Sequence, residues 1–170
     1  QEIKQSELTY FPKGSLSIRT NTIPWLLLTP NLGIEYKASD NVGLIVDGAF
    51  AHWSLNTTNK YWHIWNVASQ IRYYAGNLKN TYIGGQYTMG DYNLTGNQGS
   101  YIGGGLTLGH QFYCGHNLFV DLGLSLGYLY LYDKEEYNRI NGVNVRNDIK
   151  TSNGYWGLTG LNVTFIWKIN

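Results

Sequence analysis

Charged side chains, cysteines, prolines and long apolar runs are all scarce in this sequence. Only 14% of the residues are charged, whereas soluble domains average about 25%. A single cysteine excludes an intrachain disulfide scaffold. No apolar run approaches the roughly 18 to 20 residues that a membrane-spanning helix needs, and the richest, residues 23–28, contains Pro24. The sequence therefore excludes a helical membrane protein and a disulfide-rich secreted domain.

Two further classes are excluded by what the chain does contain. Aromatic residues make up 15% of it and β-branched residues are frequent, so a disordered chain without a core is excluded. The net charge is +1 and the basic residues are scattered, which argues against a nucleic acid partner. The mean hydropathy of −0.28 resembles that of a soluble protein. A transmembrane β-barrel also has such a value, because its apolar residues occupy alternate positions. The 170 residues suit one domain.

Alternation of apolar and small polar residues with a period of two dominates the chain, which predicts β-strands. The clearest case is residues 118–131, where Leu122, Leu124 and Leu126 alternate with glycine, serine and Asp121. Eight such strands are predicted, at residues 14–22, 31–38, 42–51, 61–74, 81–92, 100–113, 118–131 and 154–169.

The composition of the two faces indicates which one is outside. The second face carries Gly, Ser, Thr, Asn and a few charges, too small and polar for an ordinary core. The strands also match the roughly 9 to 11 residues of a tilted membrane-crossing strand. The sequence therefore predicts an all-β fold, an eight-stranded antiparallel transmembrane β-barrel of the outer-membrane type. Residues 14–170 form the barrel, and residues 1–13 form a periplasmic N-terminal segment.

The connections alternate in length, which predicts how the barrel is oriented. Those after the second, fourth and sixth strands are short, whereas those after the third, fifth and seventh are longer. The first connection is an exception, short and apolar. Outer-membrane barrels have short periplasmic turns and longer extracellular loops, so both termini are expected to be periplasmic. Residues 132–153 form the longest predicted outer loop. Tyr and Trp near the strand ends, among them Tyr73, Tyr74 and Trp167, predict an aromatic girdle.

Six charged residues fall on the inward register of the predicted strands. Isolated charges would be costly in a narrow interior, so we expect them to pair with one another and to leave no continuous pore. The three basic and three acidic residues are Arg19, Arg72, Lys168, Glu35, Asp47 and Asp121.

Several short stretches resemble a known family. They are Thr20-Asn21, residues 28–35 (LTPNLGIE), 61–65 (YWHIW), 72–74 (RYY), 127–130 (GYLY) and 165–167 (FIW). Over residues 15–170 the chain resembles small outer-membrane barrels of Bacteroides-group bacteria that form a domain of unknown function with OmpA- and OmpX-like architecture. The resemblance implies an eight-stranded barrel, a signal peptide removed before Gln1 and a role in fimbrial or other surface assembly. It implies no catalytic residues. Gln70 stands where an acidic residue is expected.

The sequence offers only weak signs of enzymatic chemistry. Lipid-modifying barrels need a histidine with a serine and an acidic residue near the outer rim, and His52, His63, Ser54 and Asp91 lie near the predicted rim. No local signature brings them into mutual reach. We therefore expect no enzyme, no cofactor and no metal site, and a lipid-modifying enzyme remains the weaker alternative.

Two non-enzymatic roles remain open: a structural or assembly component of a surface complex, for example a fimbrial one, and an outer-face binding protein or adhesin. The expected partners are outer-membrane lipid and other proteins. A soluble ligand-carrying barrel, with apolar residues inside, is a third option. In the long loop, Asn141-Gly142 predicts a hairpin that rises above the barrel. The candidate partner-binding residues of this loop are Tyr132, Tyr137, Arg139 and Arg146.

Overall fold

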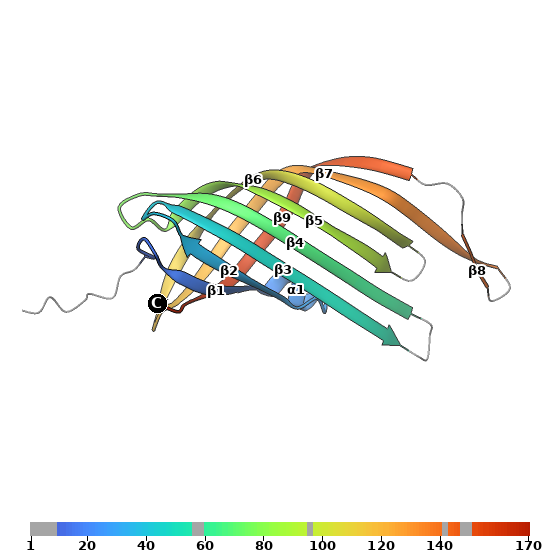
Figure 1. Cartoon of the computed structure of the whole chain (residues 1–170), viewed down its shortest axis with the longest axis horizontal. Coiled ribbons are helices and arrows are strands. Elements are labelled where there is room, and N and C mark those ends of the chain that lie inside the picture. Colours follow the sequence, from blue (N-terminus) through green and yellow to red (C-terminus); the bar gives the residue numbers. More distant parts are fainter. Residues whose placement is uncertain (1–9, 56–59, 95–96, 141–142, 147–150) are drawn as a thin grey trace, which may run out of the picture.

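The structure, a computed structural model, describes residues 10–55, 60–94, 97–140, 143–146 and 151–170. Within these ranges it has nine strands and one five-residue helix (Figure 1). In chain order they are β1 (Leu16–Asn21), α1 (Thr22–Leu26), β2 (Asn31–Lys37), β3 (Val42–Leu55), β4 (Lys60–Ala75), β5 (Thr81–Leu94), β6 (Asn97–Gly115), β7 (Leu118–Ile140), β8 (Val143–Arg146) and β9 (Thr151–Lys168). No helix in these ranges is long and apolar enough to cross a bilayer.

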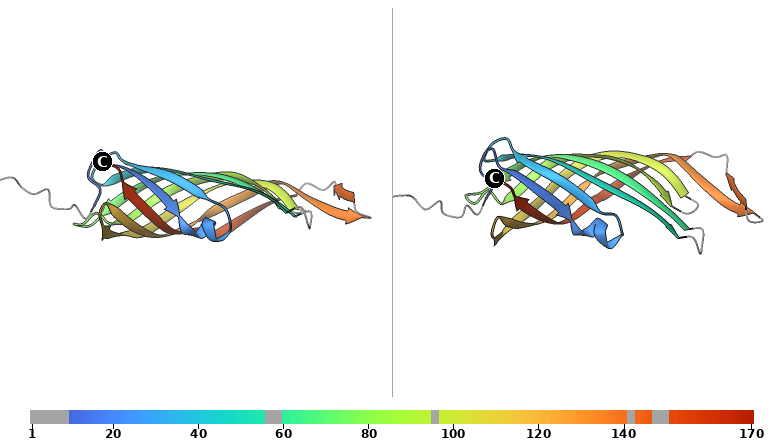
Figure 2. Two further views of the ribbon diagram at one scale, coloured as in Figure 1. Left: turned by 90° about the horizontal axis from the view of Figure 1, so that it is seen from below. Right: turned by 60° about the horizontal axis from the view of Figure 1, so that its bottom comes forward.

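Eight strands close into an antiparallel ring. Strands β1 to β7 pair in chain order, and β9 pairs with both β7 and β1. Strand β8 pairs with β7 as a separate hairpin. Figure 2 shows the ring strands running obliquely around a long, narrow barrel. The predicted all-β class and eight-stranded antiparallel closure are confirmed.

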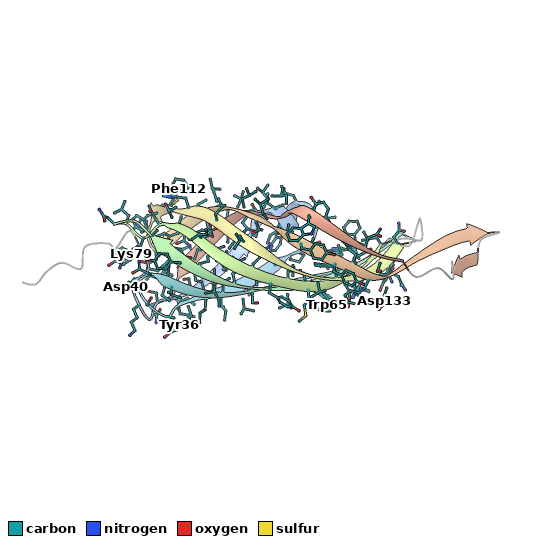
Figure 3. All side chains as sticks on the ribbon, turned by 90° about the horizontal axis from the view of Figure 1, so that it is seen from above. Tyr36, Asp40, Trp65, Lys79, Phe112 and Asp133 are labelled. Atoms are coloured by element: carbon teal, nitrogen blue, oxygen red, sulfur yellow. The ribbon has the colours of Figure 1, made fainter. Side chains whose placement is uncertain are left out.

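The alternation read from the sequence separates the inside of the ring from the outside. In β2, Asn31, Glu35 and Lys37 are buried, whereas Leu32 and Ile34 are 61% and 52% exposed. In β7, Asp121 and Ser125 are fully buried and Leu122 and Leu126 are exposed. The interior is thus polar and the exterior apolar, the reverse of a soluble domain. Figure 3 shows side chains covering the outer surface, with Tyr36 and Phe112 projecting near one end.

A small aromatic cluster fills the end of the barrel near the chain termini. Phe11, which falls inside the predicted N-terminal segment, is 1% exposed and packs on Phe119, with 4.1 Å between ring centroids. Ile166 and Tyr113 complete the cluster. The backbone amide of Lys13 donates to Asp40 Oδ1 at 2.8 Å and holds this segment to the β2–β3 turn.

The wall of the barrel differs in height around the ring. Strands β1 and β2 are short. The ladder between β2 and β3 ends at the pair of Asn31 and Ala49, whereas β3 itself continues to Leu55. Helix α1 lies where β1 and β2 end, as Figures 1 and 2 show. The sequence predicted an apolar connection here without a helix. A helix forms because Asn21 caps it, accepting a hydrogen bond from the amide of Ile23 at 3.2 Å.

The predicted outer loops were too long. Strand β3 continues to Leu55, β6 begins at Asn97, and β7 runs to Ile140. Most of the predicted loop 132–153 is therefore strand, because backbone pairing with a neighbouring strand does not require apolar side chains. Strands β7 and β8 pair Ile140 with Val143, so the predicted hairpin is confirmed, although Asn141 and Gly142 themselves lie outside the described residues.

The predicted aromatic girdle was only partly right. Tyr73 and Trp167 are exposed on the outer surface. Tyr74 is fully buried inside the barrel, because adjacent residues of a strand point to opposite faces. A tyrosine near a strand end can therefore point either into the barrel or outward, and its position along the strand alone does not tell which.

Candidate functional site: the ionic network and the cavity above it

Arg19, on β1, lies at the centre of a buried ionic network. Its guanidinium is within 3.2 Å of both Glu35 Oε2 and Asp47 Oδ1, and 3.4 Å from Asp121 Oδ2. Arg19 is 2% exposed, and both Glu35 and Asp121 are fully buried. Three carboxylates from β2, β3 and β7 thus surround one cation, which satisfies charges that would otherwise be very costly to bury.

Gly33 makes the contact between Arg19 and Asp47 possible. In the ladder Gly33 lies directly between these two residues, with β1 on one side and β3 on the other. A Cβ at Gly33 would lie 1.9 Å from Asp47 Oδ1. Only glycine leaves room for the two side chains to meet across β2.

Asp121 joins the second arginine to the first. Its carboxylate accepts hydrogen bonds from Arg72 Nη1 and from the Tyr82 hydroxyl, the latter at 2.7 Å. The guanidinium of Arg72 also stacks on the Tyr82 ring, 3.8 Å from its centroid. Gln70 Oε1 accepts from Arg72 Nε at 2.9 Å. A neutral amide therefore occupies the position where the family resemblance suggested an acid, and Asp121 supplies the negative charge from across the barrel.

Glu35 is shared by a second set of partners nearer the chain termini. It accepts a hydrogen bond from the Tyr74 hydroxyl, and Lys37 Nζ lies 3.7 Å from its Oε1. The ammonium of Lys37 also sits 2.8 Å from the centroid of the Tyr74 ring. Gln111 Nε2 donates to the Tyr74 hydroxyl at 3.1 Å. The network of ion pairs and hydrogen bonds therefore extends across the barrel interior from β2 to β4 and β6.

Five of the six predicted interior charges meet in this network. They are Arg19, Glu35, Asp47, Arg72 and Asp121. Lys168 does not join them: it lies on the inward register of β9, opposite Ser17, but is partly exposed and forms no ion pair with the described residues. Lys37 takes its place and keeps the balance at three basic and three acidic groups. Its inward register on β2 could have indicated this.

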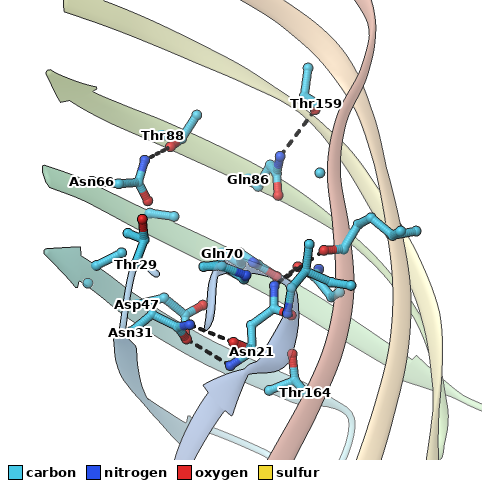
Figure 4. A pocket seen from close by; sticks show the side chains of 18 of the residues that line it. Asn21, Thr29, Asn31, Asp47, Asn66, Gln70, Gln86, Thr88, Thr159 and Thr164 are labelled. Atoms are coloured by element: carbon cyan, nitrogen blue, oxygen red, sulfur yellow. Dashed lines mark hydrogen bonds between the residues drawn. The ribbon is translucent and has the colours of Figure 1, made fainter. Parts of the chain in front are cut away.

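Above the network the barrel interior opens into a cavity of about 450 Å³. Arg19 and Asp47 form its floor, and Figure 4 shows amide and hydroxyl side chains projecting into it from several strands. Ile23, Pro24 and Leu27 of the α1 connection form one side. The sequence did not predict this cavity, because it depends on how far each strand continues beyond the charged layer.

Paired asparagines hold α1 beside the cavity. Asn31 Oδ1 accepts from the amide of Asn21 at 2.7 Å, and Asn31 Nδ2 donates to the Asn21 carbonyl at 2.6 Å (Figure 4). Trp25 Nε1 donates to Thr20 Oγ1 at 2.9 Å. Trp53 Nε1 reaches across from β3 to the carbonyl of Leu28 at 2.7 Å. The α1 connection is therefore fixed at both of its ends.

The polar residues considered for catalysis are brought together only in part. His52 and His63 lie opposite each other on β3 and β4, with their Nδ1 atoms 3.3 Å apart. Asp91 Oδ2 instead accepts from Trp65 Nε1 at 2.6 Å. Among the residues that the structure describes, no three His, Cys, Asp or Glu side chains are grouped as a metal site would require.

The candidate partner-binding residues lie on the extension of β7 and on β8. Tyr132 is stacked on Tyr130, with 6.1 Å between ring centroids. Tyr137 is the register partner of Arg146, and Arg139 is that of Asn144. The backbones of Tyr137, Arg139 and Arg146 are paired in the hairpin, whereas their side chains lie outside the described part of the chain. Whether they bind a partner stays a prediction.

A family model described as "Protein of unknown function (DUF3575)" matches residues 4–169, nearly the whole chain. The chain belongs to the DUF3575 family. No curated protein matches it.

The geometry gives a physical role to residues 28–35, one of the stretches that carried the family resemblance. In residues 28–35 every second side chain points inward. Asn31 holds α1, Gly33 leaves room for the ion pair of Arg19 and Asp47, and Glu35 belongs to the network. One strand of this DUF3575 protein thus connects the helix, the cavity floor and the buried charges.

Proposed function

We propose that this protein is a non-enzymatic outer-membrane barrel, of OmpA- and OmpX-like architecture as in small barrels of Bacteroides-group bacteria, that serves as a structural or assembly component of a surface complex. The observation that carries the proposal is the inverted distribution of polarity. Large apolar side chains are exposed around the ring, while six charged side chains pair inside it. Such a surface is stable in lipid and would aggregate in water.

The exposed α1 connection supports a membrane position. Leu26 and Leu28 are 79% and 68% exposed, and Trp25 lies beside them on the same surface. The backbone amides of Leu27 and Leu28 donate to the carbonyls of Pro24 and Trp25. An apolar segment that satisfies its own hydrogen bonds is what a bilayer requires of non-strand structure.

The two ends of the barrel support its orientation. The short turns at Ser39–Asn41 and Gly76–Asn80 lie at the same end as the described start of the chain and its C-terminus, whereas β7 and β8 extend at the opposite end (Figure 1). Short turns face the periplasm in bacterial barrels. We therefore place both termini in the periplasm and the β7–β8 hairpin outside the cell.

The buried network supports anchoring rather than conduction. Paired, fully buried charges across a narrow ring leave little room for ions to pass. A barrel of this kind serves as a membrane anchor, and the part free to meet a protein partner is the projecting β7–β8 hairpin. Its open strand edge is suited to pairing with a strand of another protein.

Replacing the hairpin tests the proposal. In a variant with a Gly-Ser link in place of residues 134–150, the barrel should still fractionate with the outer membrane and migrate as a folded, heat-modifiable band. Proteins that co-purify with the wild type from native membranes should be lost. A matched control replaces the exposed turn residue Asn77 with Gly and should keep them. Recovery of the wild-type chain in the soluble fraction, or an unchanged set of partners in the hairpin variant, would contradict the proposal.

The second candidate, an adhesin or outer-face receptor, depends on the same projecting hairpin. It predicts that purified wild-type barrel in vesicles binds host or neighbouring cells without any co-purifying protein. The hairpin variant should then lose cell binding, even though no protein co-purifies with the wild type. The two roles therefore differ in whether a stoichiometric membrane partner accompanies the chain.

A further inference from the structure

The cavity above the ionic network is lined by apolar side chains with neutral hydrogen-bonding groups placed among them. Six side-chain amides, four threonines and Tyr101 surround its volume of about 450 Å³. The two charged lining residues, Arg19 and Asp47, are paired with each other at 3.2 Å. Binding cavities for small molecules have volumes of roughly 300 to 1,000 Å³, so this one has the size of a ligand site.

Several of the polar side chains that line the cavity form a hydrogen bond to the protein through one atom and leave a second polar atom without such a bond. Asn66 Nδ2 donates to Thr88 Oγ1 at 2.8 Å and to the Tyr101 hydroxyl at 2.7 Å, and its carbonyl oxygen points into the cavity (Figure 4). Gln70 is 6% exposed; its oxygen accepts from Arg72, while its amide nitrogen has no acceptor in the described part of the chain. The hydroxyl of Thr164, on a residue 1% exposed, also lacks a hydrogen-bond partner within the described ranges.

The orientation of these groups is fixed before any ligand binds. The anchoring bonds of Asn66 and Gln70 leave one acceptor and one donor aimed at the same space. Gln86 is held at both ends, by Ser125 at 2.9 Å and by Thr159 at 3.3 Å, and stiffens the opposite wall. A buried polar group without a partner is costly, so a ligand that supplies both donors and acceptors would be favoured here.

The charge pattern and the mixture of donors and acceptors restrict the class of ligand. An anion would find Arg19 already neutralised by three carboxylates. An acyl chain would leave the free amide and hydroxyl groups without partners. A sugar carries hydroxyls that both donate and accept, and its apolar ring face packs on aromatic rings such as that of Tyr101. We propose that this cavity binds a neutral sugar unit.

The low side of the wall offers a route for the sugar. Beyond the pair of Asn31 and Ala49, β3 has no β2 residue beside it. The α1 connection lies next to this part of the wall. The α1 connection lines the cavity with Ile23, Pro24 and Leu27 and exposes Trp25 and Leu26 on its other side. The sugar could be a free oligosaccharide or the headgroup of a glycolipid that lies against this apolar surface. The binding chemistry is the same for both sources.

The test uses the full chain folded in a zwitterionic detergent. The probes are maltose, lactose and mannobiose as free sugars, and their dodecyl glycosides as lipid-linked forms. Saturation-transfer NMR should show saturable transfer from the protein to at least one free sugar, and glucuronate should show none. The same sugar should bind as its dodecyl glycoside with equal affinity if the natural ligand is free, and at least about tenfold more tightly if it is a glycolipid headgroup.

Two independent variants test the site itself. Gln70→Leu removes the free donor and should weaken binding by about tenfold. Ala68→Trp fills the cavity from β4, which Ala68 lines, without removing a hydrogen bond. Asn93→Leu, an amide outside the cavity lining, is the matched control and should bind as the wild type does. A heat-modifiable band shows that each variant is folded.

The proposal fails if no neutral sugar gives saturable transfer with the wild type, or if the folded Gln70→Leu and Ala68→Trp variants bind like the control. Preferred binding of glucuronate would also overturn it. This test does not depend on the proposed assembly role, because it measures binding by the isolated chain.

Discussion

At the scale of single residues, the interior is stable because the buried charges of the described network pair with one another, most of them across strands. Asp121 holds Arg19 and Arg72 together, and Gly33 gives Arg19 access to Asp47. On the outer surface Leu122 and its neighbours are exposed and apolar, and the proposed membrane position would require them to stay so. The two faces of one strand therefore tolerate different substitutions.

Asp121→Asn should reduce the free energy of unfolding by about 3 to 5 kcal/mol, because it leaves two buried arginines without their shared carboxylate. The matched control is Asp47→Asn. Asp47 is 24% exposed, so its loss should cost about 1 kcal/mol or less. Urea unfolding in lipid vesicles, followed by tryptophan fluorescence, measures both values. Equal losses of unfolding free energy in the two variants would show that the network depends on Asp121 no more than on Asp47.

Leu122→Arg should reduce the free energy of unfolding by about 2 to 4 kcal/mol if Leu122 lies near the middle of the bilayer. Leu122 is 45% exposed and faces away from the barrel interior. Leu122→Ala provides the size control and should cost less. The same vesicle titration measures the difference, and an arginine tolerated without loss would argue against a lipid-facing position.

At the scale of elements, α1 depends on residues from both strands that it connects. Asn21 accepts from Ile23 N and from Val163 N, the latter at 3.1 Å, and donates to Asn162 Oδ1 at 3.0 Å. A helix of five residues is too short to be stable alone. Its position is therefore set by the ends of β1, β2 and β9.

Asn21→Ala should cost about 1 to 2 kcal/mol through loss of the cap and of the contacts with β9. Amide hydrogen exchange should rise across residues 22–28 while the exchange of β4 and β5 stays slow. Asn21→Asp keeps the accepting oxygen and should show a smaller change. Uniformly faster exchange throughout the barrel would mean that Asn21 supports the whole fold rather than α1.

The β2–β3 turn holds the N-terminal segment through Asp40. The hydrogen bond from the Lys13 amide, helped by Lys79 Nζ at 3.5 Å, holds the pKa of Asp40 below its ordinary value. A lowered pKa means that this contact is complete above about pH 4. It is lost as the pH falls through the pKa of the folded state.

The chemical shift of the Lys13 amide should therefore titrate with a midpoint below 3.8, the ordinary value for the carboxyl group. The Asp40→Asn variant keeps an accepting oxygen and should show no such titration. An unchanged titration of the Lys13 amide in that variant would assign it to another group.

At the scale of the whole molecule, the ring, the charged layer and the aromatic cluster around Phe11 together close the barrel. Phe11 and Phe119 fill one end, and the ionic network lies between this cluster and the cavity. The cavity therefore lies on the side of the network that faces the end from which β7 and β8 extend.

The barrel should show no steady ion conductance in planar bilayers. The combined variant Arg72→Ala with Asp121→Ala removes a matched pair of charges and opens the layer, so it should give discrete conductance events. Leu122→Ala, on the outer face, is the control and should remain silent. Steady conductance of the wild type that does not change in the paired variant would show that the network does not block the barrel.

The sequence determined the strands, their alternation, the eight-stranded closure and five of the six charged positions proposed for the interior. It could do so because a period of two assigns each side chain to one face, and because small polar residues on the second face reveal an inverted barrel. These features depend only on neighbours along the chain.

The tertiary structure alone decided which charges meet, where the wall is low and where the cavity lies. Lys37 rather than Lys168 joins the network, because the position of a residue along the barrel axis depends on the register between strands. Helix α1 is held beside the cavity because Asn21 and Asn31, ten residues apart in the chain, become paired neighbours. Register and strand length are set by contacts across the ring, and a periodic pattern along one strand carries no information about either.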